Sequence, residues 1–116
     1  MADTILVVED DEDIAESVRD ILECGGYVVQ VAANGRVAID MLERGRAPDV
    51  ILLDLLMPIM DGIELLAELA RRPALAGIPT IVMSAGANVA MPPDVAVIHK
   101  PFKIATLFEA VKHARA

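Results

Sequence analysis

The feature that most constrains the fold is an alternation of short, uninterrupted apolar runs with longer amphipathic segments. The apolar runs are continuous rather than alternating, as expected for strands that are buried on both faces of a sheet. Such strands, separated by helices and joined by right-handed crossovers, predict a doubly wound α/β fold with a parallel sheet covered on both faces. The five predicted strands are Thr4–Val8, Tyr27–Ala32, Asp49–Leu53, Thr80–Ser84 and Val95–His99.

The amphipathic segments have apolar residues at helical spacing and recognisable stop signals. In the first of them, Val18 and Leu22 share one face, and Gly25 follows where the pattern ends. In the third, Pro73 stops the helix, because proline cannot continue one. The predicted helices are Glu12–Cys24, Asn34–Arg44, Gly62–Arg72 and a last one from about Phe102 to Arg115.

The connection between the fourth and fifth strands is unusually short. Ala85–Asp94 contains ten residues, whereas a parallel crossover usually needs about a dozen or more. Pro92 and Pro93 within it forbid a continuous helix. We therefore expect the crossover helix at this point to be short or absent.

Composition restricts the class of partner. The 116 residues include 10 basic and 18 acidic side chains, a net charge of −8, and 55% of them are hydrophobic. This composition predicts one folded domain over residues 1–116. The acidic balance argues against nucleic acid and anionic membranes, which require clustered Lys or Arg. With no apparent signal peptide or bilayer-length apolar run, and with Cys24 as a single cysteine packed at a helix end, we expect a cytoplasmic protein.

The side chains best suited to catalysis or metal binding stand at the carboxyl ends of the predicted strands. Glu9 and Asp10 follow the first strand, and Asp54 follows the third. Ser84 ends the fourth strand and Lys100 follows the fifth. Because ligands of open α/β sheets bind beyond this edge, we expect these five residues to form one site.

The residue types at this edge indicate phosphoryl chemistry. Neighbouring carboxylates repel one another unless a cation neutralises them. Oxygen ligands without Cys or His suit Mg²⁺. An ion of this kind, together with a lysine and a hydroxyl, can stabilise a phosphoryl group in transfer, and an Asp can attack phosphorus to form an acyl phosphate.

Motifs at the strand ends are the most specific signal in the chain: Ile5–Asp10, Asp54–Gly62 and Lys100–Phe102. In this order and at this spacing they resemble the receiver domain of two-component response regulators, over essentially the whole chain. The resemblance implies a flavodoxin-like, CheY-like sheet with strand order 2-1-3-4-5. It also implies a phosphorylation-dependent signalling switch, either a stand-alone regulator or a receiver from a larger protein. Its partners would be a sensor histidine kinase or histidine phosphotransfer protein and a downstream protein effector.

The resemblance also implies a role for each polar residue at this edge. Asp54 is implied as the phosphoacceptor and a metal ligand, Asp10 as a direct Mg²⁺ ligand, and Glu9 as a ligand through water. The backbone carbonyl of Leu56 is implied as a further metal ligand. Ser84 is implied as the switch hydroxyl, and Lys100 as the cation that pairs with the phosphoryl group. The family's usual cis peptide bond is expected at Lys100-Pro101.

Two positions depart from the family pattern. Val97 stands three residues before the lysine, where the family commonly has an aromatic residue that rotates inward with the switch hydroxyl. An aromatic-rotation switch is therefore not expected. Leu56, two residues after Asp54, has no polar group to orient a hydrolytic water, which predicts a slowly hydrolysed phosphorylated state.

Two other functions compete with a phosphorylation switch. A phosphohydrolase of the haloacid dehalogenase type also uses an Asp nucleophile and Mg²⁺, but it needs an acid where this chain has Leu56. A receiver fold kept as a docking module, working without phosphorylation, would not need all five site residues. We therefore expect no classical enzyme, only self-catalysed phosphoryl transfer and slow autodephosphorylation.

Some acidic residues have purely structural explanations. The carboxylates of Glu9–Asp13 could simply favour the positive end of the following helix. This accounts for Glu12 and Asp13, but it does not require Glu9 and Asp10 directly after a buried strand, so we interpret those two as functional. Asp61 and Gly62 are interpreted as a turn and a helix cap.

Overall fold

The computed structural model describes residues 3–55, 59–85, 91 and 95–115. Within these residues the chain alternates strands and helices, and each element lies within two residues of its predicted ends. The elements are β1 (Thr4–Val8), α1 (Glu12–Cys24), β2 (Val28–Ala32), α2 (Gly35–Arg44), β3 (Val50–Asp54), α3 (Gly62–Ala70), β4 (Thr80–Ser84), β5 (Ala96–His99) and α4 (Ile104–Arg115).

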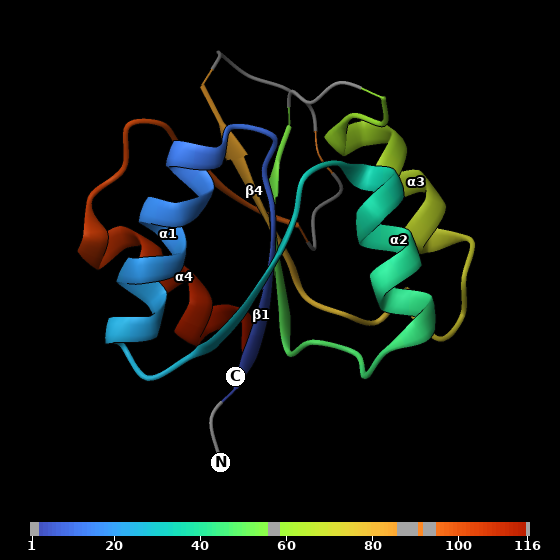
Figure 1. Cartoon of the computed structure of the whole chain (residues 1–116), viewed down its shortest axis with the longest axis horizontal. Helices are drawn as coiled ribbons and strands as arrows, with labels where there is room; N and C mark the ends of the chain where they lie inside the picture. The colour runs from blue at the N-terminus through green and yellow to red at the C-terminus, as the bar shows by residue number, and fades with distance from the viewer. Residues whose placement is uncertain (1–2, 56–58, 86–90, 92–94, 116) are drawn as a thin grey trace.

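The five strands form one parallel sheet in the order β2-β1-β3-β4-β5. This confirms both the predicted fold class and the strand order. The sheet is covered on both faces, with α1 and α4 on one side and α2 and α3 on the other (Figure 1). Every residue of β3 and β4 is buried, as the continuous apolar runs predicted.

The sheet separates two hydrophobic clusters. Successive strand residues point to opposite faces, so β1 contributes Leu6 and Val8 to one cluster and Ile5 and Val7 to the other. The first cluster includes buried side chains of α2 and α3, and the second includes those of α1 and α4. This division explains why the strands show no polar alternation.

Side-chain caps fix where three helices begin. Asp11 Oδ1 accepts hydrogen bonds from the N–H groups of Asp13 and Ile14, at the start of α1. Asn34 and Asp61 likewise accept from backbone N–H groups in the first turns of α2 and α3. The predicted capping role of Asp61 is therefore confirmed. These helices all start just beyond the carboxyl edge of the sheet.

The short crossover between β4 and β5 lies mainly outside the described residues, which here include only Ala85, Met91 and Val95. The expectation of a short or absent helix at that point therefore stays a prediction. No helix in the described part of the chain combines the length and the apolar character that a bilayer span requires.

One prediction about packing is wrong. Cys24 was expected to be packed at the end of α1, but its side chain is exposed. Leu22, two residues earlier, is fully buried, and residues two apart on a helix point in widely different directions. Cys24 therefore faces the solvent although it follows a core residue closely.

Candidate functional site

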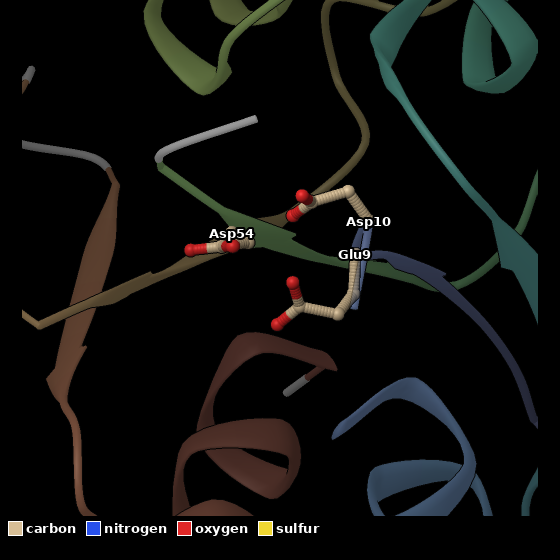
Figure 2. A group of neighbouring side chains, drawn as sticks. All are labelled: Glu9, Asp10 and Asp54. Atoms are coloured by element: carbon tan, nitrogen blue, oxygen red, sulfur yellow. The ribbon is translucent and has the colours of Figure 1, made fainter. Parts of the chain in front are cut away.

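Three carboxylates meet at the carboxyl edge of the sheet. Glu9 and Asp10 directly follow β1, and Asp54 ends β3 (Figure 2). One carboxylate oxygen from each of the three lies within 4.8 Å of the other two. Glu9 is only 2% exposed and Asp54 only 7%, whereas Asp10 is exposed. The structure thus brings the predicted acidic residues together, with two of them in the floor of the site.

Sheet register explains this convergence. Val8 of β1 pairs with Leu53 of β3, and Glu9 and Asp54 are the residues that directly follow this pair in the chain. The hydrogen-bonded ladder continues past the strand ends, because the N–H of Glu9 donates to the Ala32 carbonyl at 3.0 Å. The carboxylates are therefore held by backbone that belongs to the sheet.

Lys100 joins the two buried carboxylates. Its Nζ lies 3.1 Å from Glu9 Oε1 and 3.4 Å from Asp54 Oδ1. Its backbone N–H donates to the Ser84 carbonyl at 2.7 Å, which ties the end of β5 to the end of β4. The Lys100-Pro101 peptide bond is cis, as expected from the resemblance. One ammonium group thus contacts two carboxylates of a cluster of three.

Burial and neighbouring groups shift the pKa values of Glu9 and Lys100. Burial, with a hydrogen bond to Asp54, raises the pKa of Glu9 to about 7, although the hydrogen bond from Lys100 acts to lower it. Burial acts to lower the pKa of Lys100, but its hydrogen bond to Glu9 and the charge of Asp54 outweigh this, and the pKa is raised. Lys100 is therefore charged at neutral pH, while Glu9 without a metal is partly protonated. Three carboxylates with one lysine form an arrangement that suits a further cation.

Of the other residues singled out in the sequence, Ser84 and Val97 are described by the structure and Leu56 is not. Ser84 is buried and ends β4, one residue beyond the Met83 that pairs with Asp54. It therefore lies at the same edge of the sheet. Leu56, the predicted backbone-carbonyl ligand, lies outside the described residues. Val97 lies within β5 and is partly exposed.

Sequence reasoning missed two features of the site. The first is the ion pair between Glu9 and Lys100, whose burial is signalled by Glu9 following a fully apolar run. The second is Ile59, whose φ of 70° lies in the left-handed region. Nothing in an isoleucine residue signals that conformation, because β-branched residues strongly disfavour it.

Gly62 packs tightly against the backbone that carries Asp54. Its N–H donates to the Leu55 carbonyl at 2.9 Å, so the chain leaves β3 and returns beside it. A Cβ at position 62 would lie 2.8 Å from Leu55 Cα and 2.9 Å from the Asp54 carbonyl oxygen. Only glycine fits there without displacing the end of β3.

Gly62→Ala is therefore expected to lower the free energy of unfolding by about 1–3 kcal/mol, because the new methyl group must push backbone atoms apart. Gly77→Ala is the matched control, since a Cβ there meets nothing within 4 Å. Urea unfolding of both variants measures the effect. Equal stabilities would show that the end of β3 yields without cost.

Comparison with known proteins connects this geometry to a family. Residues 5–112 match the family model of the response regulator receiver domain. The chain belongs to this family. It is 40% identical over 85 residues to response regulator MprA of Mycolicibacterium vanbaalenii, covering 73% of this chain and 36% of that protein. The Mycobacterium bovis MprA is 39% identical over 89 residues, 77% of this chain and 37% of the relative. This receiver domain thus spans little more than a third of the length of these relatives.

Solved receiver domains share the fold over nearly the whole chain. The receiver domain of a signal transduction histidine kinase from Syntrophus aciditrophicus is 36% identical, with a TM-score of 0.86, covering 98% of this chain and 90% of that one. A putative response regulator from Chloroflexus aurantiacus is 27% identical, with a TM-score of 0.90 and coverage of 99% and 98%. The resemblance drawn from the sequence motifs is therefore confirmed at the level of family and fold.

Proposed function

We propose that this receiver domain is a phosphorylation-dependent switch of a two-component system, in which Asp54 accepts a phosphoryl group with the help of Mg²⁺. The observation that carries the proposal is the cluster of Glu9, Asp10 and Asp54, with Lys100 Nζ in contact with two of them. The donor is a sensor histidine kinase or a histidine phosphotransfer protein, and the output passes to a downstream protein effector in the cytoplasm.

The acidic cluster fits a hard divalent cation. Its donors are all oxygen atoms, and one lysine leaves their charge incompletely neutralised. Asp10 and Asp54 would hold Mg²⁺ directly and Glu9 through water, with the Leu56 carbonyl as the ligand that falls outside the described residues. When bound, Mg²⁺ would offset the negative charge on the phosphoryl oxygens.

The residues of the chain supply the rest of the transfer. A carboxylate oxygen of Asp54 forms a bond to phosphorus while the bond from phosphorus to the donor's imidazole nitrogen breaks. The released imidazole nitrogen takes a proton from solvent. Lys100 pairs with the incoming phosphoryl group, and the Ser84 hydroxyl donates to it as the switch group. Asp54 is thereby converted to an acyl phosphate.

Incubation with Mg²⁺ and acetyl phosphate, followed by intact mass spectrometry, tests the proposal. Wild type is expected to gain one phosphoryl group, and EDTA is expected to abolish the gain. Asp54→Asn is expected to gain none, because an amide is a far weaker nucleophile than a carboxylate. Labelling of Asp54→Asn would contradict the assigned acceptor. An unlabelled wild type would favour the docking module that works without phosphorylation.

Leu56 is expected to prolong the phosphorylated state. Leu56→Asn or Leu56→Glu introduces a polar group that can orient water toward the phosphoryl group, and should speed dephosphorylation by up to about 100-fold. Leu56→Val is the matched control and should leave the rate unchanged. The loss of phosphoryl group from purified protein is followed by mass spectrometry. An unchanged rate in both polar variants would refute this role.

A further inference from the structure

Most of the exposed large aliphatic side chains lie on the carboxyl side of the sheet, where Asp54 also lies. Seven large hydrophobic residues are exposed in the described part of the chain, and Val28 and Val97 lie in strands. The other five lie in the β3–α3 connection or in the first turns of helices, beyond the carboxyl edge of the sheet: Ile14, Val37, Ile59, Ile63 and Ile104. We call these five residues the apolar rim of the carboxyl edge, the edge at which the acidic site lies.

Ile59 stands out within this rim. It is 76% exposed, so packing inside the chain does not explain an isoleucine there. Its φ of 70° is a conformation that a β-branched side chain strongly disfavours. A glycine or asparagine would adopt this conformation more easily. A strained residue with an exposed apolar side chain points to a role outside the folded chain.

The segment after Ile59 is held firmly against the fold. Met60 packs on the start of α2, where a Cβ on Gly35 would come within 2.8 Å of Met60 Cγ. Asp61 caps α3, and Gly62 is hydrogen-bonded to Leu55 beside Asp54. These contacts fix residues 60–62 next to the phosphoacceptor. Ile63, 53% exposed, follows in the first turn of α3.

Because Asp54 is buried, a protein that donates a phosphoryl group to it must contact the apolar rim. Asp54 is only 7% exposed, so a phosphoryl group carried on a protein reaches it only if that protein lies against the surrounding edge. A small donor such as acetyl phosphate enters without such contact. An effector that binds another face need not touch the rim at all.

Resting on the proposed function, we infer that Ile59, together with Ile63, is an apolar contact for the phosphohistidine-bearing protein that phosphorylates Asp54. Ile59 is thus a specificity-determining residue rather than a catalytic one. Its conformational strain is kept because the exposed side chain is used in the complex with the donor.

The test compares a protein donor with a small donor. Ile59→Asn keeps a side chain that tolerates the left-handed conformation but removes the apolar surface. Val28→Asn is the matched control. Val28 is also β-branched and exposed, but it begins β2 at the opposite edge of the sheet. The protein donors are purified histidine kinases of the source organism, autophosphorylated with ATP, and the fastest donor to wild type is used.

Ile59→Asn is expected to accept from the kinase at least about 10-fold more slowly than wild type, the scale of losing one buried apolar contact. Its labelling by acetyl phosphate should stay within about twofold, and its Tm should rise by a few degrees as the strain is relieved. Val28→Asn should match wild type with both donors. Equal transfer rates from the kinase would overturn the inference, as would a wild type that accepts from acetyl phosphate but from no kinase. A wild type that accepts from neither donor would instead refute the proposed function.

Discussion

Lys100→Met is expected to lower the free energy of unfolding of the metal-free protein by about 3–5 kcal/mol near pH 8. The substitution removes the ammonium group that lies within 3.4 Å of both Glu9 and Asp54, which are almost completely buried. Asp54 and the ionised fraction of Glu9 would then remain in the floor of the site without a counter-charge. Urea unfolding in EDTA measures the loss.

The same variant should lose much less stability near pH 5.5. In the wild type, the folded-state pKa of Glu9 is about 7, above the ordinary value of 4.5. A raised folded-state pKa stabilises the fold below the unfolded pKa, and this contribution is lost as the pH rises through the folded pKa. Removing the Lys100 charge raises the pKa of Glu9 further, so Glu9 is protonated near pH 5.5 and the repulsion is relieved.

A double variant provides the control. Glu9→Gln removes one of the two stranded charges, so Lys100→Met should cost less in that background than in the wild type. If Lys100→Met cost the same in both backgrounds and at both pH values, its effect would come from lost packing and not from charge.

Leu107→Ala is expected to lower the free energy of unfolding by about 2–5 kcal/mol. Leu107 of α4 is fully buried in the cluster between the sheet and the helices α1 and α4, so truncation leaves a cavity. Ile104→Ala, three residues earlier on the same helix, is the matched control, because Ile104 is more than half exposed. The control should lie within about 0.5 kcal/mol of wild type. Urea unfolding that ranked the two variants equally would contradict the described packing of α4.

The strands and the convergence of the site were predictable for the same physical reason. A strand buried on both faces must be apolar along its whole length, so a carboxylate directly after it, such as Glu9, marks both the strand end and the sheet edge. Parallel pairing then brings Glu9 beside Asp54 although the two are far apart in sequence. The motifs around Asp54 and Lys100 then indicated the family to which the chain belongs.

Other features depend on packing that no local pattern encodes. The ion pair between Glu9 and Lys100 joins residues 91 positions apart. The close approach of Gly62 to Leu55 exists only once the chain has returned to the end of β3. Cys24 was misassigned because it lies two residues after the buried Leu22, and two residues along a helix lead to a different face.

Because the site residues stand at strand ends, mutations that affect folding can be distinguished from mutations that affect the site itself. Glu9, Asp54 and Ser84 sit on backbone belonging to the hydrogen-bonded sheet, whereas the helices that lie against its faces contribute a separate part of the core. A truncation in a helix, such as Leu107→Ala, should therefore reduce the fraction of molecules that are folded, while each folded molecule keeps the geometry of the carboxylate site. Any loss of function in a cell would then arise through protein abundance, and the site of each folded molecule would be preserved.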